Sequence, residues 1–110
     1  MTPRTQKYLA DAQKAAIAIV EFLETKSLED FKNNLLLLSA VERQLIIAGE
    51  ALNLASQEKE DLELDIPDLW KIVGLRNRLV HGYDIIRAEI LWDVCKEKIP
   101  LLQKRLMELL

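Results

Sequence analysis

The sequence predicts an all-α protein, an antiparallel bundle of four to five helices in one domain spanning residues 1–110. Three glycines and three prolines leave little material for turns. Hydrophobic residues recur at three- and four-residue spacing along most of the chain, and no run alternates as a strand does. Half of the residues are hydrophobic and 30% are charged, a balance that suits amphipathic helices.

The first predicted helix runs from about residue 5 to residue 24, because its hydrophobic residues form one stripe at helical spacing. After a short polar segment, Ser27 is a candidate N-cap. Asp30 follows three residues later and could return a hydrogen bond to the backbone of Ser27, as in a capping box. We therefore expect a new helix to begin directly after Ser27.

The second helical region covers about residues 28–57 and is expected to break near Asn33 and Asn34, since asparagine side chains compete for local backbone hydrogen bonds. Its main part has a three–four repeat made of Leu38, Val41, Leu45, Ala48, Leu52 and Ala55. Such a repeat predicts a central helix packed nearly antiparallel on a neighbour. Gly49 disfavours the helix by about 1 kcal/mol relative to alanine, which suggests that another backbone comes close there. The alternative is that the helix simply tolerates this glycine.

The second half of the chain predicts two further helices. An acidic connector over residues 59–65 leads to Pro67, which suits the first turn of a third helix ending near Gly82. The last helix begins after Asp84. Because Pro100 lacks a backbone donor, we expect a kink in that helix.

The charge balance limits what the protein can bind. A net charge of -3 argues against binding nucleic acid with the whole surface, because phosphate contacts need local positive charge. Any RNA site must therefore be a patch. The chain offers one, because the segment from residue 71 to residue 87 contains four cations and a single acidic residue, Asp84. These cations are Lys71, Arg76, Arg78 and Arg87. Of them, Lys71, Arg78 and Arg87 are candidate RNA-binding residues.

Several classes of protein are excluded or disfavoured by composition. One histidine and one cysteine cannot form a conventional zinc site, so we expect no metal and no cofactor. Cys95 is expected to be a small buried group in a reducing compartment. We see no signal peptide and no apolar run of membrane-spanning length, and we expect a cytoplasmic protein without membrane contact.

The candidate chemistry lies in one segment, residues 74–83, at the predicted end of the third helix. Asn77 and His81 are four residues apart and share a helix face, while Arg76 and Tyr83 would align if the helix continued that far. Histidine can exchange a proton near neutral pH, and arginine can hold a phosphoryl group with two hydrogen bonds. Together they supply what RNA cleavage by the adjacent 2′-hydroxyl requires, without a metal.

The residue pattern alone leaves simpler interpretations open. A single histidine at a helix end is more often a cap or a hydrogen-bonded core residue. Tyr83 could be a packing residue, and Arg78 a solvated surface charge. Glu50 could be a surface charge or a buried partner for the Arg76–His81 region.

The same segment resembles the HepT family of the HEPN superfamily. That family is marked by an arginine, a polar residue and a histidine after four to six intervening residues, which Arg76, Asn77 and His81 match. The HepT-type extension, His-x-Tyr, is matched by His81 and Tyr83. Further similarity is found at Ile66-Pro67, Trp70, Ile72 to Asn77, Trp92 and Gly49-Glu50-Ala51.

The resemblance implies a HEPN-like helical bundle that forms a homodimer and pairs two motifs across the two-fold axis. It implies a metal-independent endoribonuclease toxin with an RNA substrate. It also implies a partner, a minimal nucleotidyltransferase antitoxin of the MNT type, which uses ATP to adenylylate the motif tyrosine, here Tyr83.

The residues supply a reason for a dimer. RNA transesterification benefits from one group that deprotonates the 2′-hydroxyl and a second that protonates the leaving oxygen, and each chain has one histidine. A two-fold interface brings the same patch of two subunits together. Our hypothesis is that His81 acts as base or acid, Arg76 stabilises the phosphorane-like charge, and Asn77 orients His81 or the phosphate.

Two other functions are compatible with the sequence. The bundle could be a non-catalytic binding module that docks a nucleotidyltransferase or its substrate. It could also be a structural helical dimerisation protein, in which the clustering of the motif residues would be a coincidence.

Overall fold

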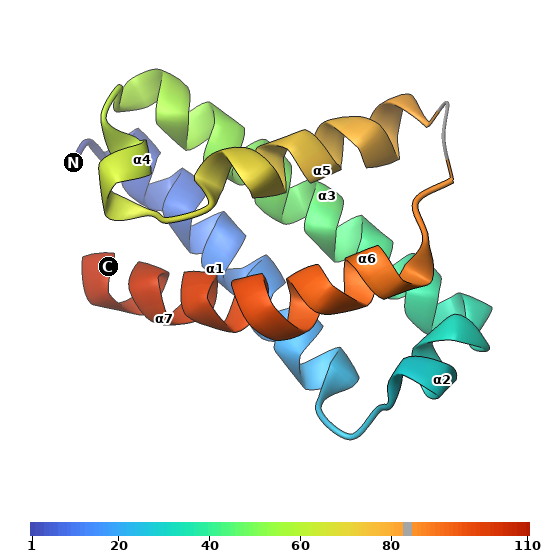
Figure 1. Ribbon diagram of the computed structural model, residues 1–110. Helices are drawn as coiled ribbons and strands as arrows, with labels where there is room; N and C mark the ends of the chain where they lie inside the picture. The colour runs from blue at the N-terminus through green and yellow to red at the C-terminus, as the bar shows by residue number, and fades with distance from the viewer. Residues whose placement is uncertain (83–84) are drawn as a thin grey trace.

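The protein is seen here in a computed structural model that describes residues 1–82 and 85–110. The described residues form helices and connecting turns, with no strand among them (Figure 1). In chain order the elements are α1 (Pro3–Leu23), α2 (Leu28–Lys32), α3 (Leu35–Glu58), α4 (Leu62–Asp65), α5 (Leu69–His81), α6 (Ala88–Asp93), a π-helical turn (Val94–Lys98) and α7 (Ile99–Leu109). The all-α prediction is confirmed.

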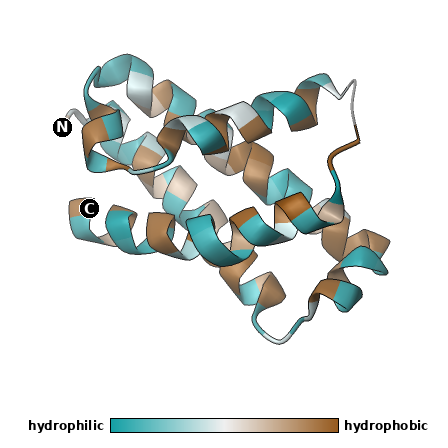
Figure 2. Ribbon diagram, in the orientation of Figure 1, coloured by the Kyte–Doolittle hydropathy of each residue, from teal (hydrophilic) through white to brown (hydrophobic). Residues whose placement is uncertain are grey.

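Helix α3 is the central element of the bundle, as its apolar repeat predicts. It packs against α1 on one side and against α5 on another, while α7 packs on α1. Figure 1 shows α5 and the α6–α7 segment in front of α1 and α3, with the two termini at the same end of the molecule. Hydrophobic and hydrophilic segments alternate along the long helices, as expected for a bundle with one core (Figure 2).

The core includes five members of the three–four repeat on α3, all buried: Val41, Leu45, Ala48, Leu52 and Ala55. Leu38, the sixth, is partly buried against this core. Cys95 is buried as predicted, and burial in apolar surroundings raises the pKa of its thiol to about 12. Cys95 is therefore an inert packing residue.

The predicted break near Asn33 and Asn34 is confirmed. Ser27 and Asp30 form the capping box that starts α2, with hydrogen bonds of 3.1 and 2.9 Å. Asn33 ends α2, and the Asn34 side chain accepts a 3.0 Å hydrogen bond from the Leu37 amide to start α3. Each asparagine satisfies backbone groups that a continuous helix would have satisfied itself.

The start of α5 differs from the prediction. Pro67 does not occupy its first turn, because α5 begins at Leu69 after Asp68 adopts a left-handed backbone conformation with φ of 64°. This turn allows both Ile66 and Leu69 to be buried. The Asp68 carboxylate lies 3.3 Å from the Lys98 ammonium group, and this contact lowers the pKa of Asp68 below its usual value. The acidic connector also contains the short helix α4.

The C-terminal helix is irregular just before Pro100. The residues from Val94 to Lys98 form a π-helical turn, in which the Ile99 amide bonds to the Val94 carbonyl oxygen. Such turns are among the known causes of local irregularity in helices. Lys96 projects from this turn and donates a 2.9 Å hydrogen bond to the Leu23 carbonyl oxygen at the end of α1.

Candidate active site

The predicted site residues Arg76, Asn77, Arg78 and His81 all lie in the last two turns of α5. The helix ends at His81, as predicted, because Gly82 adopts a left-handed conformation with φ of 35°. The Gly82 amide donates a 3.0 Å hydrogen bond to the Arg78 carbonyl oxygen. The predicted alignment of Arg76 with Tyr83 required a longer helix, and Tyr83 itself lies outside the described residues.

Arg76 is anchored at its base by an unusually close contact between α5 and α3. A Cβ atom at Gly49 would lie 2.3 Å from Cβ of Arg76 and 3.2 Å from the carbonyl oxygen of Ile72. Any residue larger than glycine at position 49 would force the helices apart. The prediction that another backbone approaches Gly49 is therefore confirmed, and the approaching segment is the one that carries the motif arginine.

The guanidinium group of Arg76 is held by two neighbours. Its Nη2 lies 2.6 Å from Oε2 of Glu50 on α3, and its Nη1 donates a 2.9 Å hydrogen bond to Oδ1 of Asn77. The Nε atom is buried and has no hydrogen-bond partner among the described residues. Because the Arg76 and Glu50 side chains are 22% and 42% exposed, the ion pair lies at the surface rather than in the core. Glu50 is thus a direct partner of Arg76.

His81 is exposed at the end of α5, one helical turn beyond Asn77. Its imidazole ring has no hydrogen-bond partner among the residues that the structure describes. Its ring is therefore neither a helix cap nor a core residue, and it is open to a ligand. Asn77 and His81 lie on the same exposed side of the helix end. Arg76 lies toward α3, and its head group contacts Glu50 and Asn77.

The three weaker candidates are exposed cations around the same helix. Lys71 lies on α5, and its ammonium nitrogen is 3.4 Å from Oδ1 of Asp68. Arg78 lies on α5 and forms no ion pair within residues 1–82 and 85–110. Arg87, at the start of α6, has its Nε 3.6 Å from Oε2 of Glu89. Helix α5 itself contains no acidic residue, but carboxylates outside it lie close to Lys71, Arg76 and Arg87. The positive patch therefore stays a prediction.

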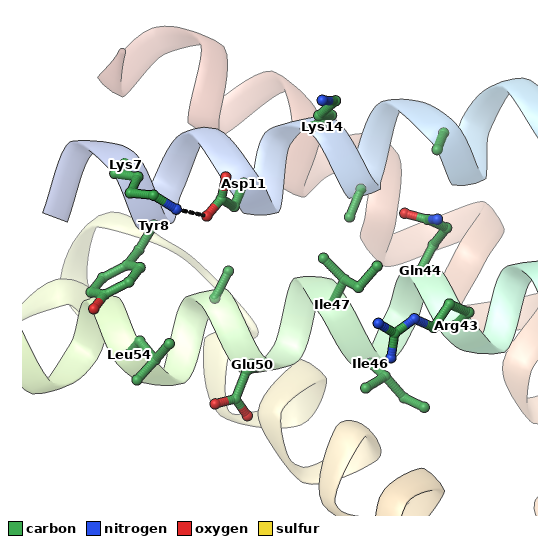
Figure 3. Close-up of a pocket in the computed structure, with 13 residues that line it drawn as sticks. Lys7, Tyr8, Asp11, Lys14, Arg43, Gln44, Ile46, Ile47, Glu50 and Leu54 are labelled. Atoms are coloured by element: carbon green, nitrogen blue, oxygen red, sulfur yellow. Dashed lines mark hydrogen bonds and ion pairs between the residues drawn. The ribbon is translucent and has the colours of Figure 1, made fainter. Parts of the chain in front are cut away.

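A groove of about 640 Å³ adjoins the site and was not predicted from the sequence. It lies between α1 and α3, and Figure 3 shows Tyr8 and the Lys7–Asp11 hydrogen bond at one end. Glu50 borders the groove, and in this view its carboxylate is directed away from α1 toward α5. Helical spacing alone could not reveal a groove that two helices form together.

The bundle and the Arg76–Asn77–His81 motif at the end of α5 define a HEPN-like protein. Comparison with known proteins agrees. The family model described as Ribonuclease HepT-like matches residues 12–109. The chain belongs to the ribonuclease HepT-like family of the HEPN superfamily, which confirms the resemblance seen in the sequence.

Relatives of this chain are found in archaea and bacteria. A protein of Methanocaldococcus jannaschii, named "Putative RNase", is 35% identical over 88% of each chain. A protein of the same name from Caldanaerobacter subterraneus is 33% identical over 99% of this chain and 95% of its own. The "Probable ribonuclease HepT" of Thermococcus cleftensis is 33% identical over 93% of this chain and 92% of its own. No solved structure gives a significant match.

Within residues 1–82 and 85–110, no three His, Cys, Asp or Glu side chains are close enough together to hold a metal ion. No helix in the same ranges is long and apolar enough to cross a membrane.

Proposed function

We propose that this protein is the toxin of a toxin–antitoxin pair: a metal-independent endoribonuclease that cuts RNA at a cleft shared by two copies of the chain. The observation that carries the proposal is the exposed His81 ring at the end of a positively charged helix, one turn from Asn77, which is bonded to Arg76. Membership of the HepT-like family and the names of the relatives support it.

The proposed reaction is an internal transesterification. One His81 removes the proton from a 2′-hydroxyl, and O2′ attacks the adjacent phosphorus. The bond from phosphorus to O5′ breaks, and O5′ receives a proton from the His81 of the second copy. The products are a 2′,3′-cyclic phosphate and a 5′-hydroxyl. Arg76 stabilises the charge on the phosphoryl oxygens, and Asn77 orients Arg76.

The proposed dimer follows from the number of groups that can transfer a proton. Each chain has one histidine, whereas the reaction benefits from both a base and an acid. A two-fold arrangement that faces two α5 ends across one cleft provides both groups. The exposure of His81 and Asn77 in a single chain leaves these side chains free to face such a cleft.

Replacing His81 tests the reaction. His81→Ala should lower the rate of RNA cleavage by roughly 100- to 10,000-fold, because general acid–base catalysis contributes about that much. The fold should be unaffected, since the side chain is exposed. The assay incubates purified protein with RNA in EDTA and looks for fragments with cyclic phosphate ends. Cleavage by His81→Ala at the wild-type rate would refute the assignment, and no cleavage by the wild type would favour a non-catalytic binding module.

The proposed control of the toxin is adenylylation of Tyr83 by an MNT-type nucleotidyltransferase. The phenolic oxygen attacks the α-phosphorus of ATP, an O–P bond forms, and pyrophosphate leaves. The added nucleotide is bulky and negatively charged, so it would oppose RNA at a cationic helix by occupancy and repulsion.

Tyr83→Phe should retain ribonuclease activity and resist the antitoxin, because it lacks the attacking oxygen. Mass spectrometry after incubation with the nucleotidyltransferase and ATP should show the added adenylyl group on the wild type alone. Equal neutralisation of both proteins would contradict control by modification.

A further inference from the structure

Helix α5 contains a glycine that the fold of the single chain does not require. A Cβ atom at Gly74 would have no heavy atom of the described residues within 4 Å, whereas one at Gly49 would collide with Arg76. A glycine inside a helix is less favourable than alanine there. The packing of this chain thus accounts for Gly49 but not for Gly74, which suggests that something outside the chain needs the space above Gly74.

Gly74 lies between functional residues on one side of α5. Trp70, Gly74, Asn77 and His81 are separated by four, three and four residues, which places them in one row along the helix. We call these four residues the outer stripe. Trp70 is 52% exposed, and its indole N–H donates a hydrogen bond to the carboxylate of Glu63, which restrains the ring. The stripe therefore consists of a fixed aromatic ring, an open gap, an amide and an imidazole.

The charge around the outer stripe favours an anionic ligand. Lys71 and Arg78 lie beside the stripe on α5, which carries no acidic residue. Lys71 is 3.4 Å from Asp68, and Arg78 forms no ion pair with a described residue. Arg76 lies on the other side of the helix and is paired with Glu50. Aromatic rings beside positive charge are the features with which proteins bind single-stranded nucleic acid, since bases stack on the rings and cations attract the backbone.

We infer that the outer stripe binds single-stranded RNA, with a base stacked on Trp70 and the backbone passing over Gly74 toward Asn77 and His81. This inference rests on the proposed function and adds a binding site beyond the scissile phosphate. Eleven residues separate Trp70 from His81, about 16 Å along the helix axis. Several nucleotides fit this length, since the rise per stacked nucleotide is about 3.4 Å.

A second copy of the chain is the rival occupant, and charge disfavours it. Direct contact between two outer stripes across a two-fold axis would place Lys71 and Arg78 of one copy near the same cations of the other. Like charges in contact oppose association. An RNA strand between the two helices would instead neutralise both.

Trp70 can report the interaction directly. The chain has two tryptophans, so Trp92→Phe leaves Trp70 as the single indole. Phenylalanine retains the aromatic contact that Trp92 makes with Phe31. In this background, His81→Ala prevents cleavage during the measurement. Titration with a 12-nucleotide single-stranded RNA of mixed sequence should quench the Trp70 emission as a base stacks on the ring.

Variants of the outer stripe, made in the His81→Ala protein, then measure how much the stripe contributes to RNA affinity. Binding is followed by the fluorescence anisotropy of the same RNA labelled with a dye. Trp70→Ala should weaken binding by roughly 5- to 100-fold, the range expected for loss of one stacked base. Trp70→Phe should retain most of the affinity. Gly74→Leu should weaken binding without loss of thermal stability, because its side chain enters open space. Phe22→Ala, which removes an exposed aromatic on α1, is the matched control and should bind as tightly as the parent.

The outcomes separate this inference from the proposed function. If RNA binds but Trp70 emission and the affinity of Trp70→Ala are unchanged, the outer stripe is not an RNA site, and the ribonuclease proposal stands. If light scattering shows that Trp70→Ala or Gly74→Leu turns dimers into monomers, the stripe is a contact between copies and the inference is overturned. If no RNA is bound by the parent and none is cut by the wild type, both proposals fail.

Discussion

Gly49 and Gly74 are both helical glycines near the motif, but their surroundings are opposite. Gly49 faces Arg76 and Ile72 at a distance that admits no side chain, whereas the space above Gly74 is open. The first marks the inner face of α5, where contacts within the chain position the arginine. The second marks the outer face, where Asn77 and His81 are exposed. The same residue type thus serves the packing of the chain at position 49, whereas at position 74 we propose that it leaves space for a ligand.

Among the substitutions that test this comparison, the largest effect is expected from a change on the inner face of α5. Gly49→Ala should lower the free energy of unfolding by about 1–3 kcal/mol, as overpacking does elsewhere, because the new methyl group would push α5 away from α3. Arg76 would move with α5, so ribonuclease activity should fall as well. Urea denaturation and RNA cleavage measure the two effects. Wild-type stability for this variant would show that the helices separate easily and that the inner face is not a rigid support.

The next effect concerns the ion pair between Glu50 and Arg76. Glu50→Gln leaves a weaker, uncharged hydrogen bond to the guanidinium group, so kcat should fall about tenfold as Arg76 loses its orientation. Stability should change by less than about 1 kcal/mol, because the carboxylate is 42% exposed.

The matched control for Glu50→Gln is Glu58→Gln, which also removes an α3 carboxylate paired with an arginine, here Arg4 at 3.3 Å. Since Arg4 is outside the site, kcat should stay at the wild-type value. Equal kcat values for the two variants would show that Glu50 does not position Arg76. A change in KM alone would also contradict a positioning role.

The smallest effect, and one of opposite sign, is expected on the outer face. Gly74→Ala should raise the free energy of unfolding by up to about 1 kcal/mol, because alanine favours the helix and its methyl group meets open space. Thermal denaturation of Gly74→Ala and Gly49→Ala in parallel measures the difference in stability between the two variants. A loss of stability in both variants would remove the distinction between the two faces.

Local features of the fold could be predicted from the sequence because they depend on neighbouring residues. Ser27 and Asp30 form their capping box within one turn, and the two asparagines end one helix and begin the next. Gly49 was predicted to lie at a close approach because its cost within a helix is local. What approaches it could not be predicted, because the contact joins residues that are distant in sequence.

The parts that sequence reasoning missed depend on long-range packing. Arg76 pairs with Glu50 across two helices, and the spacing of residues could not decide between this role and a plain surface charge. Asp68 takes a left-handed conformation so that Ile66 and Leu69 are both buried, which moves the start of α5 past Pro67. Trp70 was noted as part of the family resemblance, but its exposure beside Gly74 is visible only in three dimensions.

Because α5 lacks acidic residues, the proposed binding of RNA should depend on salt concentration. If Lys71, Arg76 and Arg78 all contact phosphates of the proposed RNA strand, they would displace about three counterions. The logarithm of the affinity would then fall by roughly 2 for each tenfold rise in salt concentration, per chain engaged. The rest of the acidic surface repels the strand, and this repulsion is strongest at low ionic strength. If the proposed RNA site is correct, a strand that approaches in dilute salt would therefore be oriented toward α5 before any base is contacted.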